Sequence, residues 1–317
     1  MRTCTLWMTG LALACLSGLA PAADGNDDGD ESYQALRPEL VLSNDADDNE
    51  ARKLSLGWDA WRQDHQRWVG VEVQDARFSG EGWSHDEQRV YLRAAGLFGE
   101  APASDDTWRW QARVGSNGDE LLGNATFNTD GPRRREIFIE RDLLETEQGI
   151  ARSQVYTLAG AAIDHPFGER TSGTALAALQ DFDDGNLRSH LRGNLVYAAL
   201  PEHGISVQLR GRYYGNSDPY LGGYYSPEWY GEALGVLALR RVVGGHAWRA
   251  VAGFGRQRSS DEDWKRARMF ELGYESPRWR RSWLRVNAGY TDTPVATSTG
   301  TGNYSYRYVM LESVVAF

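Results

Sequence analysis

Apolar and polar side chains alternate along this sequence in many separate segments of about ten residues. In "KLSLGWDAW", leucine, tryptophan and alanine occupy every second position, and lysine, serine, glycine and aspartate lie between them. Successive side chains of a strand point to opposite faces, so this spacing gives each strand one apolar and one polar face. Membrane-spanning strands have about this length, roughly 9–11 residues. The repetition therefore predicts an all-β fold built from two-faced strands.

The alternation and the turn signals between the segments predict sixteen strands. Their ranges are 36–44, 51–62, 66–78, 87–98, 106–116, 119–128, 133–140, 152–164, 169–181, 186–200, 204–215, 229–241, 246–257, 265–276, 281–292 and 303–317. Short connections such as "QDHQ", "DGPR" and "LPEHG" alternate with longer ones such as "SGEGWSHDE" and "NSDPYLGGYYSPE". An even number of strands, with short turns at one end and long loops at the other, predicts a transmembrane antiparallel outer-membrane β-barrel over residues 36–317.

The first 22 residues have the features of a secretory signal peptide. Arg2 supplies a basic start, an apolar run follows, and "APA" offers a small-residue cleavage site. Both cysteines, Cys4 and Cys15, lie in this segment, so we expect a mature chain without disulfides or thiolate metal sites. Cys15 also raises the alternative of a lipoprotein anchor, to which "ALAC" is a poor match.

Residues 23–35 are predicted to be an acidic disordered linker, because "ADGNDDGDE" lacks the hydrophobic residues that a folded segment buries. At the other end, the chain finishes in Phe317 after the apolar strand "YVMLESVVAF". A terminal aromatic residue is typical of outer-membrane barrels. Export signal, barrel pattern and terminal residue together predict a location in the lipid bilayer of the bacterial outer membrane.

A soluble β-sandwich or a lipocalin-like barrel would also show alternation, with its polar face toward solvent. Two observations favour the membrane barrel. The polar faces carry repeated arginines, which suits a water-filled lumen. The apolar faces carry aromatic residues near strand ends, as the interfacial girdles of membrane barrels do. These aromatic residues are Trp108, Trp110, Tyr197, Tyr213 and Tyr290.

One segment, "ERDLLETEQGIAR", departs from the alternation. Its apolar residues have helical spacing, Asp142 with Glu145 matches a capping box, and Gly149 is placed as a helix stop. We predict a short helix near 142–149 on the long-loop side. It is either an ordinary loop helix or a constriction that folds into the mouth of the barrel.

The polar faces of the strands define a predicted lumen with mixed charge and tyrosines. Such a lining suits a hydrated, hydroxyl-rich chain, because rings stack on sugar faces and charged groups exchange hydrogen bonds with hydroxyls at many weak sites. Opposite charges that pair across strands would equally stabilise the wall. The predicted lumen and polysaccharide-path residues are Arg89, Arg93, Arg109, Arg113, Arg188, Arg192, Arg210, Arg212, Glu72, Glu136, Glu232, Glu271 and Tyr91. The predicted mouth aromatics are Tyr220, Tyr224, Tyr225, Trp229 and Tyr230.

The sequence gives no sign of catalysis, of a cofactor or of a metal site, so we expect a protein that is not an enzyme. The histidines are scattered, and no Ser-His-Asp set converges at one end of the predicted barrel. "DFDDGN" (181–186) has the flavour of a calcium loop but lacks its downstream ligands, so a turn at Gly185 and Asn186 is expected and a structural cation is the less favoured alternative. The net charge of −10 and the missing basic patch argue against nucleic acid as a partner.

Several stretches in fixed order resemble one known family. They are "FIERDLLETEQGI", "QDFDDGNLRSHLRGNLVY", "LPEHGISVQLRGRYY", "YYSPEWYGEALGVLALRR" and "MFELGYESP". Together they resemble the C-terminal barrel of the poly-β-1,6-N-acetylglucosamine export porins (PgaA type) over about residues 36–317. The "YYSP" element also resembles the barrel component of bacterial cellulose synthase. The order and spacing of these stretches carry the resemblance, since no single motif is diagnostic.

The resemblance implies a sixteen-stranded outer-membrane pore that exports a poly-N-acetylglucosamine-like exopolysaccharide, often for biofilm. Full-length exporters of this type carry a long tetratricopeptide-repeat region before the barrel, and this sequence contains no such helical repeat. We therefore expect a separate periplasmic tetratricopeptide-repeat protein as a partner. Two alternatives stay open: a general small-solute porin, and a surface-binding or adhesin barrel that uses the loop around residues 220–230.

Overall fold

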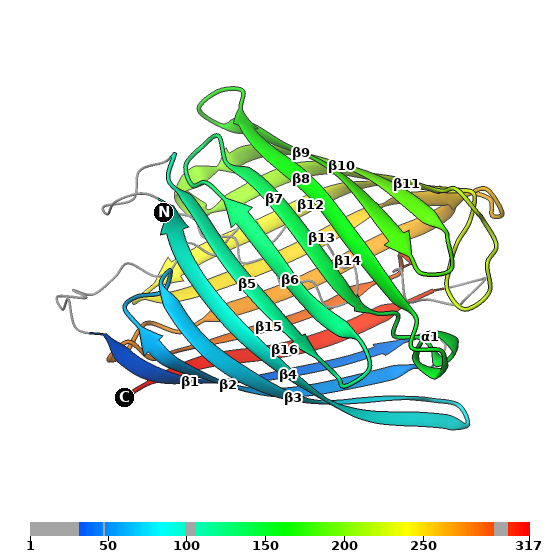
Figure 1. The fold of residues 1–317 in the computed structure, drawn as a ribbon. Helices are drawn as coiled ribbons and strands as arrows, with labels where there is room; N and C mark the ends of the chain where they lie inside the picture. The colour runs from blue at the N-terminus through cyan, green and yellow to red at the C-terminus, as the bar shows by residue number, and fades with distance from the viewer. Residues whose placement is uncertain (1–31, 47, 99–105, 295–303) are drawn as a thin grey trace.

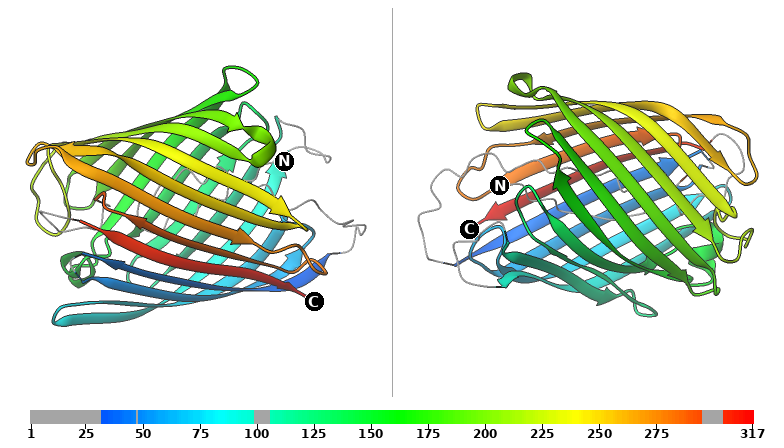
Figure 2. Two further views of the ribbon diagram at one scale, coloured as in Figure 1. Left: turned by 180° about the vertical axis from the view of Figure 1, so that it is seen from behind. Right: turned by 90° about the horizontal axis from the view of Figure 1, so that it is seen from above.

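Sixteen strands form one closed barrel in which every strand pairs antiparallel with its sequence neighbours and β1 pairs with β16 (Figures 1 and 2). This computed structural model describes residues 32–46, 48–98, 106–294 and 304–317. The closed all-β barrel that the alternation predicts is confirmed. The predicted signal peptide and most of the predicted linker lie outside the described residues.

The strand bounds agree with the predicted ranges to within a few residues. The strands are β1 (Tyr33–Asp45), β2 (Glu50–Arg62), β3 (Trp68–Gly80), β4 (Trp83–Phe98), β5 (Trp108–Ser116), β6 (Leu121–Asn128), β7 (Arg135–Leu143), β8 (Val155–Pro166), β9 (Thr171–Phe182), β10 (Leu187–Leu200), β11 (Ile205–Asn216), β12 (Trp229–Val243), β13 (His246–Ser259), β14 (Lys265–Glu275), β15 (Trp283–Thr291) and β16 (Tyr306–Ala316). A short helix, α1 (Glu147–Ala151), follows β7, and a 3₁₀ turn, η1 (Pro201–His203), follows β10. None of the helices within the described ranges is long and apolar enough to cross a bilayer.

The start of β1 and the end of β16 lie at one end of the barrel, together with the short turns (Figure 1). We call this the turn end. α1 lies at the opposite end, which we call the loop end because the long connection between β11 and β12 is also there (Figure 1). The expected segregation is present only in part: the long connections 144–154 and 217–228 lie at the loop end, but 46–49, 117–120 and 183–186 at the same end are as short as the turns.

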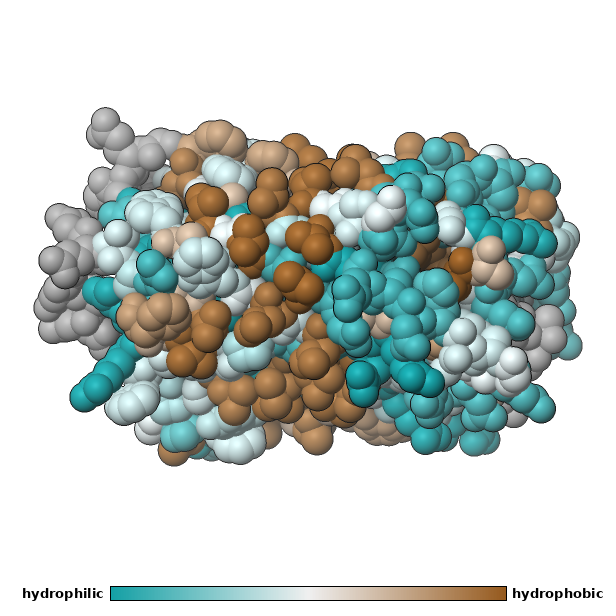
Figure 3. Space-filling view, turned by 60° about the horizontal axis from the view of Figure 1, so that its bottom comes forward, coloured by the Kyte–Doolittle hydropathy of each residue, from teal (hydrophilic) through white to brown (hydrophobic). Residues whose placement is uncertain are grey.

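Alternation sorts the side chains of each strand between lipid and lumen. On β2, Leu54 and Leu56 are half exposed on the outer face, whereas Lys53 and Ser55 point inward and are buried. The same contrast runs around the barrel, and Figure 3 shows the outer apolar side chains as a band across its middle, with a hydrophilic surface toward the loop end. A belt of exposed leucine, valine and isoleucine around a closed barrel with a polar interior is what a lipid bilayer stabilises.

A register shift in β2 falls between Asp59 and Trp61, opposite β3. Because of this bulge, Ala60 and Trp61 both lie on the outer face, and Arg62 returns to the interior. Inside the barrel the Arg62 guanidinium then pairs with the buried Asp59 carboxylate at 2.5 Å. Simple alternation does not predict this pair, because a bulge inverts the phase of the strand after it.

The prediction that "SGEGWSHDE" forms a long loop is wrong. β3 continues to Gly80 and β4 begins at Trp83, so only Glu81 and Gly82 form the turn. Gly82 has a φ of 80°, which a residue with a side chain rarely adopts. The indole of Trp83 lies over Gly80, where a Cβ would collide with it. The resulting hairpin extends beyond its neighbours at the loop end (Figure 1).

The predicted position of the helix near 142–149 is also wrong, although a short helix is present. β7 runs to Leu143, and Asp142 pairs with Tyr156 in the sheet. The Asp142 carboxylate accepts hydrogen bonds from the Leu143 amide and from Arg89, so it does not cap a helix. Thr146 caps α1 instead, since its hydroxyl accepts from the Gly149 amide at 3.0 Å. Gly149 accordingly lies within the helix rather than at its end.

Replacing Leu209 by arginine should destabilise the barrel in lipid. Leu209 is exposed in the middle of β11, between Leu195 of β10 and Gly235 of β12. An arginine on the lipid face near the bilayer centre costs about 2–4 kcal/mol of folding free energy. Reversible urea unfolding in lipid vesicles measures the change, with Leu209→Ala as the control for lost packing. Equal stability of the arginine and alanine variants would contradict a membrane position for this face.

Candidate functional site

Arginines and carboxylates from neighbouring strands pair along the inner wall. Glu72 on β3 accepts from Arg93 of β4 at 2.7 Å and lies 3.3 Å from Arg113 of β5. A Cβ on Gly57 of β2 would collide with the Arg93 guanidinium, so the glycine leaves room for this group. The Arg113 guanidinium lies 3.7 Å from the ring centre of Tyr91. All three charged side chains are almost completely buried, so Glu72 holds two cations inside the wall.

A second chain of ion pairs crosses the seam where the barrel closes. Glu312 of β16 accepts from Arg37 of β1 at 2.9 Å and from Arg285 of β15 at 3.3 Å. Arg285 also donates to Glu275 of β14 at 2.9 Å. Arg37 and Arg93 each lie within 5 Å of the ring centre of Trp68, at 4.9 and 4.7 Å. This tryptophan therefore connects the two groups of charges.

Further pairs line the same wall, including Arg249 with Glu271 at 2.8 Å and Arg212 with Glu232 at 3.6 Å. Arg109 pairs with Asp130, and Glu136 with Arg134, near the turn end. Opposite charges therefore pair across strands along these parts of the wall, as one of the two expectations for the lumen residues stated. Positive charge is nevertheless concentrated on β10 and β11, where Arg192 faces Arg212 across the two strands and Arg188 and Arg210 lie on the same inner face.

Residues 217–228, the connection between β11 and β12, pack against side chains of the lumen. We call them the inward loop. The Tyr224 ring stacks on Phe182 of β9, with ring centres 4.4 Å apart and an angle of 18°. The Tyr224 hydroxyl accepts from the buried Asn186 amide at 2.9 Å and donates to Asp184 at 3.3 Å. Burial raises the pKa of Tyr224 above its usual range, with a further rise from Asp184, so its hydroxyl stays protonated.

Arg188 of β10 is the centre of the aromatic cluster at the mouth. Its guanidinium lies 5.1, 4.8 and 5.6 Å from the ring centres of Phe182, Tyr214 and Tyr224. It donates to the Tyr225 carbonyl at 2.6 Å and to Asn216 at 2.8 Å. Arg188 is 1 % exposed, so ring faces and oxygen acceptors replace its water shell. The cation holds the inward loop by its backbone.

α1 meets the inward loop across the mouth. A Cβ on Gly223 would lie 3.2 Å from the Gln148 side-chain oxygen. The helix and the loop are therefore so close at this point that a side chain larger than that of glycine would be crowded. Leu144 before the helix and Ile150 within it are buried. Lys53 of β2 pairs with Glu145 and ties the segment to the inner wall. Helix and loop therefore lie against each other at the loop end of the barrel.

The predicted lumen residues all lie on inward-facing positions of their strands. Arg192, Arg212 and Glu232 are partly exposed, and the others are buried. Their role as a path for a polysaccharide stays a prediction. The buried members of the set are Arg89, Arg93, Arg109, Arg113, Arg188, Arg210, Glu72, Glu136, Glu271 and Tyr91.

The predicted mouth aromatics divide into two groups. Tyr224, Tyr225 and Tyr230 are buried in the aromatic cluster, where Tyr230 stacks on Tyr214 with ring centres 5.0 Å apart. Tyr220 is exposed, and Trp229 is partly exposed beside Arg258. The buried rings pack on protein groups rather than at an outer interface.

Sequence reasoning missed Trp68, Phe182 and Tyr214, which connect charges or stack with the inward loop. The alternation contained a signal for Tyr214, because it lies two residues after the inward Arg212. Phe182 and Trp68 lie at strand ends, where the phase of alternation is hardest to read. Within the described parts of the chain, no group of histidine, cysteine, aspartate or glutamate side chains has the arrangement of a metal site.

Changing Tyr224 to alanine should release the inward loop. The variant loses the stack on Phe182 and the bonds to Asn186 and Asp184. Proteinase K should then cleave residues 217–228 at least severalfold faster than in the wild type, because exposed loops are preferred cleavage sites. Tyr220→Ala is the matched control, since Tyr220 is 61 % exposed. Equal cleavage rates for the two variants would show that the stack does not hold the loop.

Comparisons with known proteins identify the fold. No known family matches the chain by sequence, and no curated protein is similar enough in sequence to match it. A solved structure described as a bacterial polysaccharide outer membrane secretin is similar, with a TM-score of 0.64 and 13% identity. The match covers 90% of this chain and 98% of that one. The outer membrane protein OprD from Pseudomonas aeruginosa gives a TM-score of 0.42 at 10% identity, over 90% of this chain and 94% of the other.

The fold class follows from the closed barrel, its outer apolar belt and the likeness to the bacterial polysaccharide outer membrane secretin. The chain is an outer-membrane β-barrel of sixteen strands. Its polar interior, lined by paired charges, is the architecture of an outer-membrane pore. The finer resemblance to the poly-N-acetylglucosamine export porins stays a prediction.

Proposed function

We propose that this barrel is a non-catalytic outer-membrane pore through which an exopolysaccharide, such as a poly-N-acetylglucosamine-like chain, leaves the cell. The observation that carries the proposal is the lining of the lumen, where paired charges lead to a cluster of aromatic rings at the mouth. The cluster consists of Phe182, Tyr214, Tyr224, Tyr225 and Tyr230 around Arg188.

Each part of this lining suits a hydroxyl-rich chain. Paired arginines and carboxylates offer both donors and acceptors to sugar hydroxyls, and their balance avoids a single site strong enough to stop the chain. Aromatic faces stack on the apolar faces of sugar rings. A chain that leaves through the mouth must displace or pass beside the inward loop, so its buried rings, Tyr224 and Tyr225, are the rings of the loop that it meets there.

The fold shared with the bacterial polysaccharide outer membrane secretin supports the proposal. A general small-solute porin is the second candidate, because the same charged lumen suits ions and small polar solutes equally well. The contact between α1 and the inward loop at the mouth favours the polymer channel, since a general porin needs an open path at rest.

Deletion of the gene tests the proposal directly. Secreted polysaccharide and biofilm should fall strongly in the deletion strain and return when the wild-type gene is restored. The Tyr220→Ala gene serves as a matched control, because this ring lies outside the cluster. Unchanged secretion after deletion would exclude the export function, and large open currents of the wild-type barrel in planar bilayers would favour the porin.

We also propose that a separate periplasmic tetratricopeptide-repeat protein delivers the polymer to the turn end. This follows from the resemblance to exporters that carry such repeats in the same chain. Affinity purification of the barrel from gently solubilised envelopes should recover a repeat protein. Polymer export reconstituted with the barrel and a synthase alone would make such a partner unnecessary.

A further inference from the structure

Seven arginines form an arc on the outer face of the barrel near the loop end. We call them the outer arginine arc. Each of them is among the four residues of its strand that lie nearest the loop end. The strands that carry them are β13, β14, β16, β2 and β3. They are Arg256, Arg258, Arg266, Arg268, Arg307, Arg52 and Arg77. On the loop-side outer face of β4 to β12, Arg141 is the only arginine among the described residues, and it pairs with Glu120.

Two pairs in the arc place like charges directly opposite each other. Arg256 faces Arg266 across β13 and β14, and Arg52 faces Arg77 across β2 and β3. Like charges in directly opposite positions destabilise a sheet. The two opposed arginine pairs therefore do not contribute to the stability of the barrel on their own. An anion that bridges the guanidinium groups removes the repulsion and explains the placement.

The carboxylates near the arc do not neutralise it. Of the arc's arginines on β13 and β14, only Arg268 has an ion-pair partner among the described residues, Asp292 at 2.7 Å. Asp261 and Asp263 lie in the connecting loop and form no ion pair with these arginines within the described part of the chain. Arg52 and Arg77 have Asp75 and Asp86 at 3.7 Å, where both partners are about half exposed and the attraction is weak.

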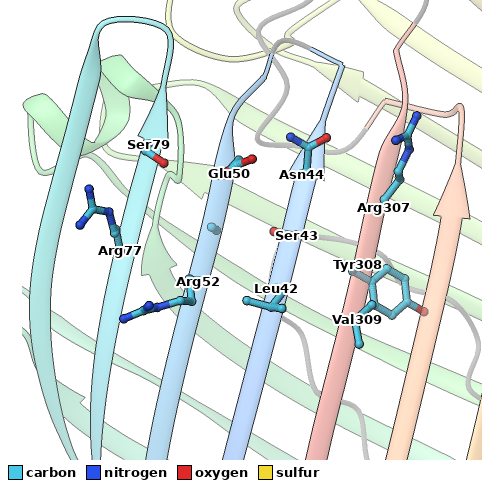
Figure 4. Close-up of a pocket in the computed structure, with 11 residues that line it drawn as sticks. Leu42, Ser43, Asn44, Glu50, Arg52, Arg77, Ser79, Arg307, Tyr308 and Val309 are labelled. Carbon is cyan, nitrogen blue, oxygen red and sulfur yellow. The ribbon is translucent and has the colours of Figure 1, made fainter.

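Apolar and aromatic side chains lie directly beside the arc on the membrane side. Phe254 and Phe270 make an edge-to-face contact with ring centres 5.5 Å apart, and Phe254 is paired with Arg268 across the strands. Near the barrel seam, a cavity of about 500 Å³ is lined in part by three arginines and one carboxylate, with apolar residues beside them (Figure 4). These residues are Arg52, Arg77, Arg307, Glu50, Leu42 and Val309. Cations at the edge of an apolar surface match a lipid with an anionic headgroup and acyl chains.

We propose that the outer arginine arc binds the phosphate groups of a lipid carrying more than one phosphate, in the leaflet at the loop end. The headgroup phosphates lie between the opposed arginines, and the acyl chains cover the phenylalanines and the apolar side of the cavity. The barrel is therefore laterally asymmetric, with one side that retains a phosphorylated lipid and another, around β4 to β12, that does not.

Binding of lipid A to the purified mature barrel in detergent, measured by native mass spectrometry, tests this proposal. The charge-neutral variant Arg256→Gln/Arg266→Gln should bind lipid A roughly 30-fold more weakly, because each basic residue near an anionic lipid surface contributes a factor of several. Arg52→Gln/Arg307→Gln should also weaken binding. Arg135→Gln/Arg241→Gln is the matched control, since it removes the same charge from the outer face at the turn end.

The proposal requires that dephosphorylated lipid A binds weakly to the wild type and that the control variant binds lipid A normally. Equal loss in the control variant, or no loss in Arg256→Gln/Arg266→Gln, would overturn it. Displacement of lipid A by millimolar inorganic phosphate would also overturn it, because the arc would then be a site for a free anion. Unchanged β-sheet circular dichroism and heat-modified gel mobility verify that each variant is folded.

Discussion

Replacing residues 218–227 by a short Gly-Ser linker is expected to raise the single-channel conductance of the barrel severalfold. The wild type should conduct little, because Tyr224 and Tyr225 of the inward loop pack against Arg188 and Phe182 inside the mouth. Without the loop, water and ions reach the charged wall directly. Planar-bilayer recordings at fixed salt measure the difference.

Point variants separate the role of the loop from a general weakening of the barrel. Tyr224→Ala should give brief openings of intermediate size, because the backbone bond from Arg188 to the Tyr225 carbonyl stays in place. Tyr220→Ala should behave as the wild type. A loop-deleted barrel with wild-type conductance would place the constriction elsewhere, and α1, tied to the wall through Lys53 and Glu145, would be the next segment to remove.

The Glu72→Gln variant should lose about 3–5 kcal/mol of unfolding free energy, because it leaves two buried arginines without their shared carboxylate. Arg93 and Arg113 both pair with Glu72, and all three residues are at most 9% exposed. Urea unfolding in lipid vesicles measures the change. A smaller loss in Glu72→Gln/Arg93→Met is expected, since the double variant removes one of the unpaired charges.

Asp75→Asn is the matched control for this measurement. Asp75 pairs with Arg52 on the outer face at 3.7 Å, and both side chains are about half exposed. Exposed pairs of this kind contribute less than about 1 kcal/mol. If Glu72→Gln and Asp75→Asn changed stability equally, the inner wall would be hydrated well enough for water to replace the lost partner.

The period of two in the sequence predicts the barrel, its strand number and the inward or outward direction of most side chains. It does so because successive side chains of a strand point to opposite faces, one toward lipid and one toward the water-filled lumen. Each residue type is therefore selected by its own immediate surroundings. The alternation alone therefore assigns Arg93, Arg113 and Glu72 to the lumen. The alternation fails at Trp61 and Arg62, where the bulge changes the phase.

Signals that depend on capping or loop length were less reliable. Asp142 and Glu145 match a capping box, yet the sheet continues through Asp142, because Tyr156 of β8 pairs with it and the Arg89 guanidinium of β4 binds its carboxylate. "SGEGWSHDE" contains two glycines and many polar residues, yet most of it extends β3 and β4. In both segments, strand pairing with distant residues outweighs local preference.

By itself, the sequence determined the architecture, since strands with one apolar and one polar face satisfy lipid and water only in a closed barrel. Which groups meet inside was decided by the tertiary structure alone. The register between strands places Glu72 between two arginines, brings Arg188 under the backbone of the inward loop and sets Arg256 opposite Arg266. Such contacts join residues far apart in the chain, and their distances depend on strand stagger and loop path, which no local pattern of side chains encodes.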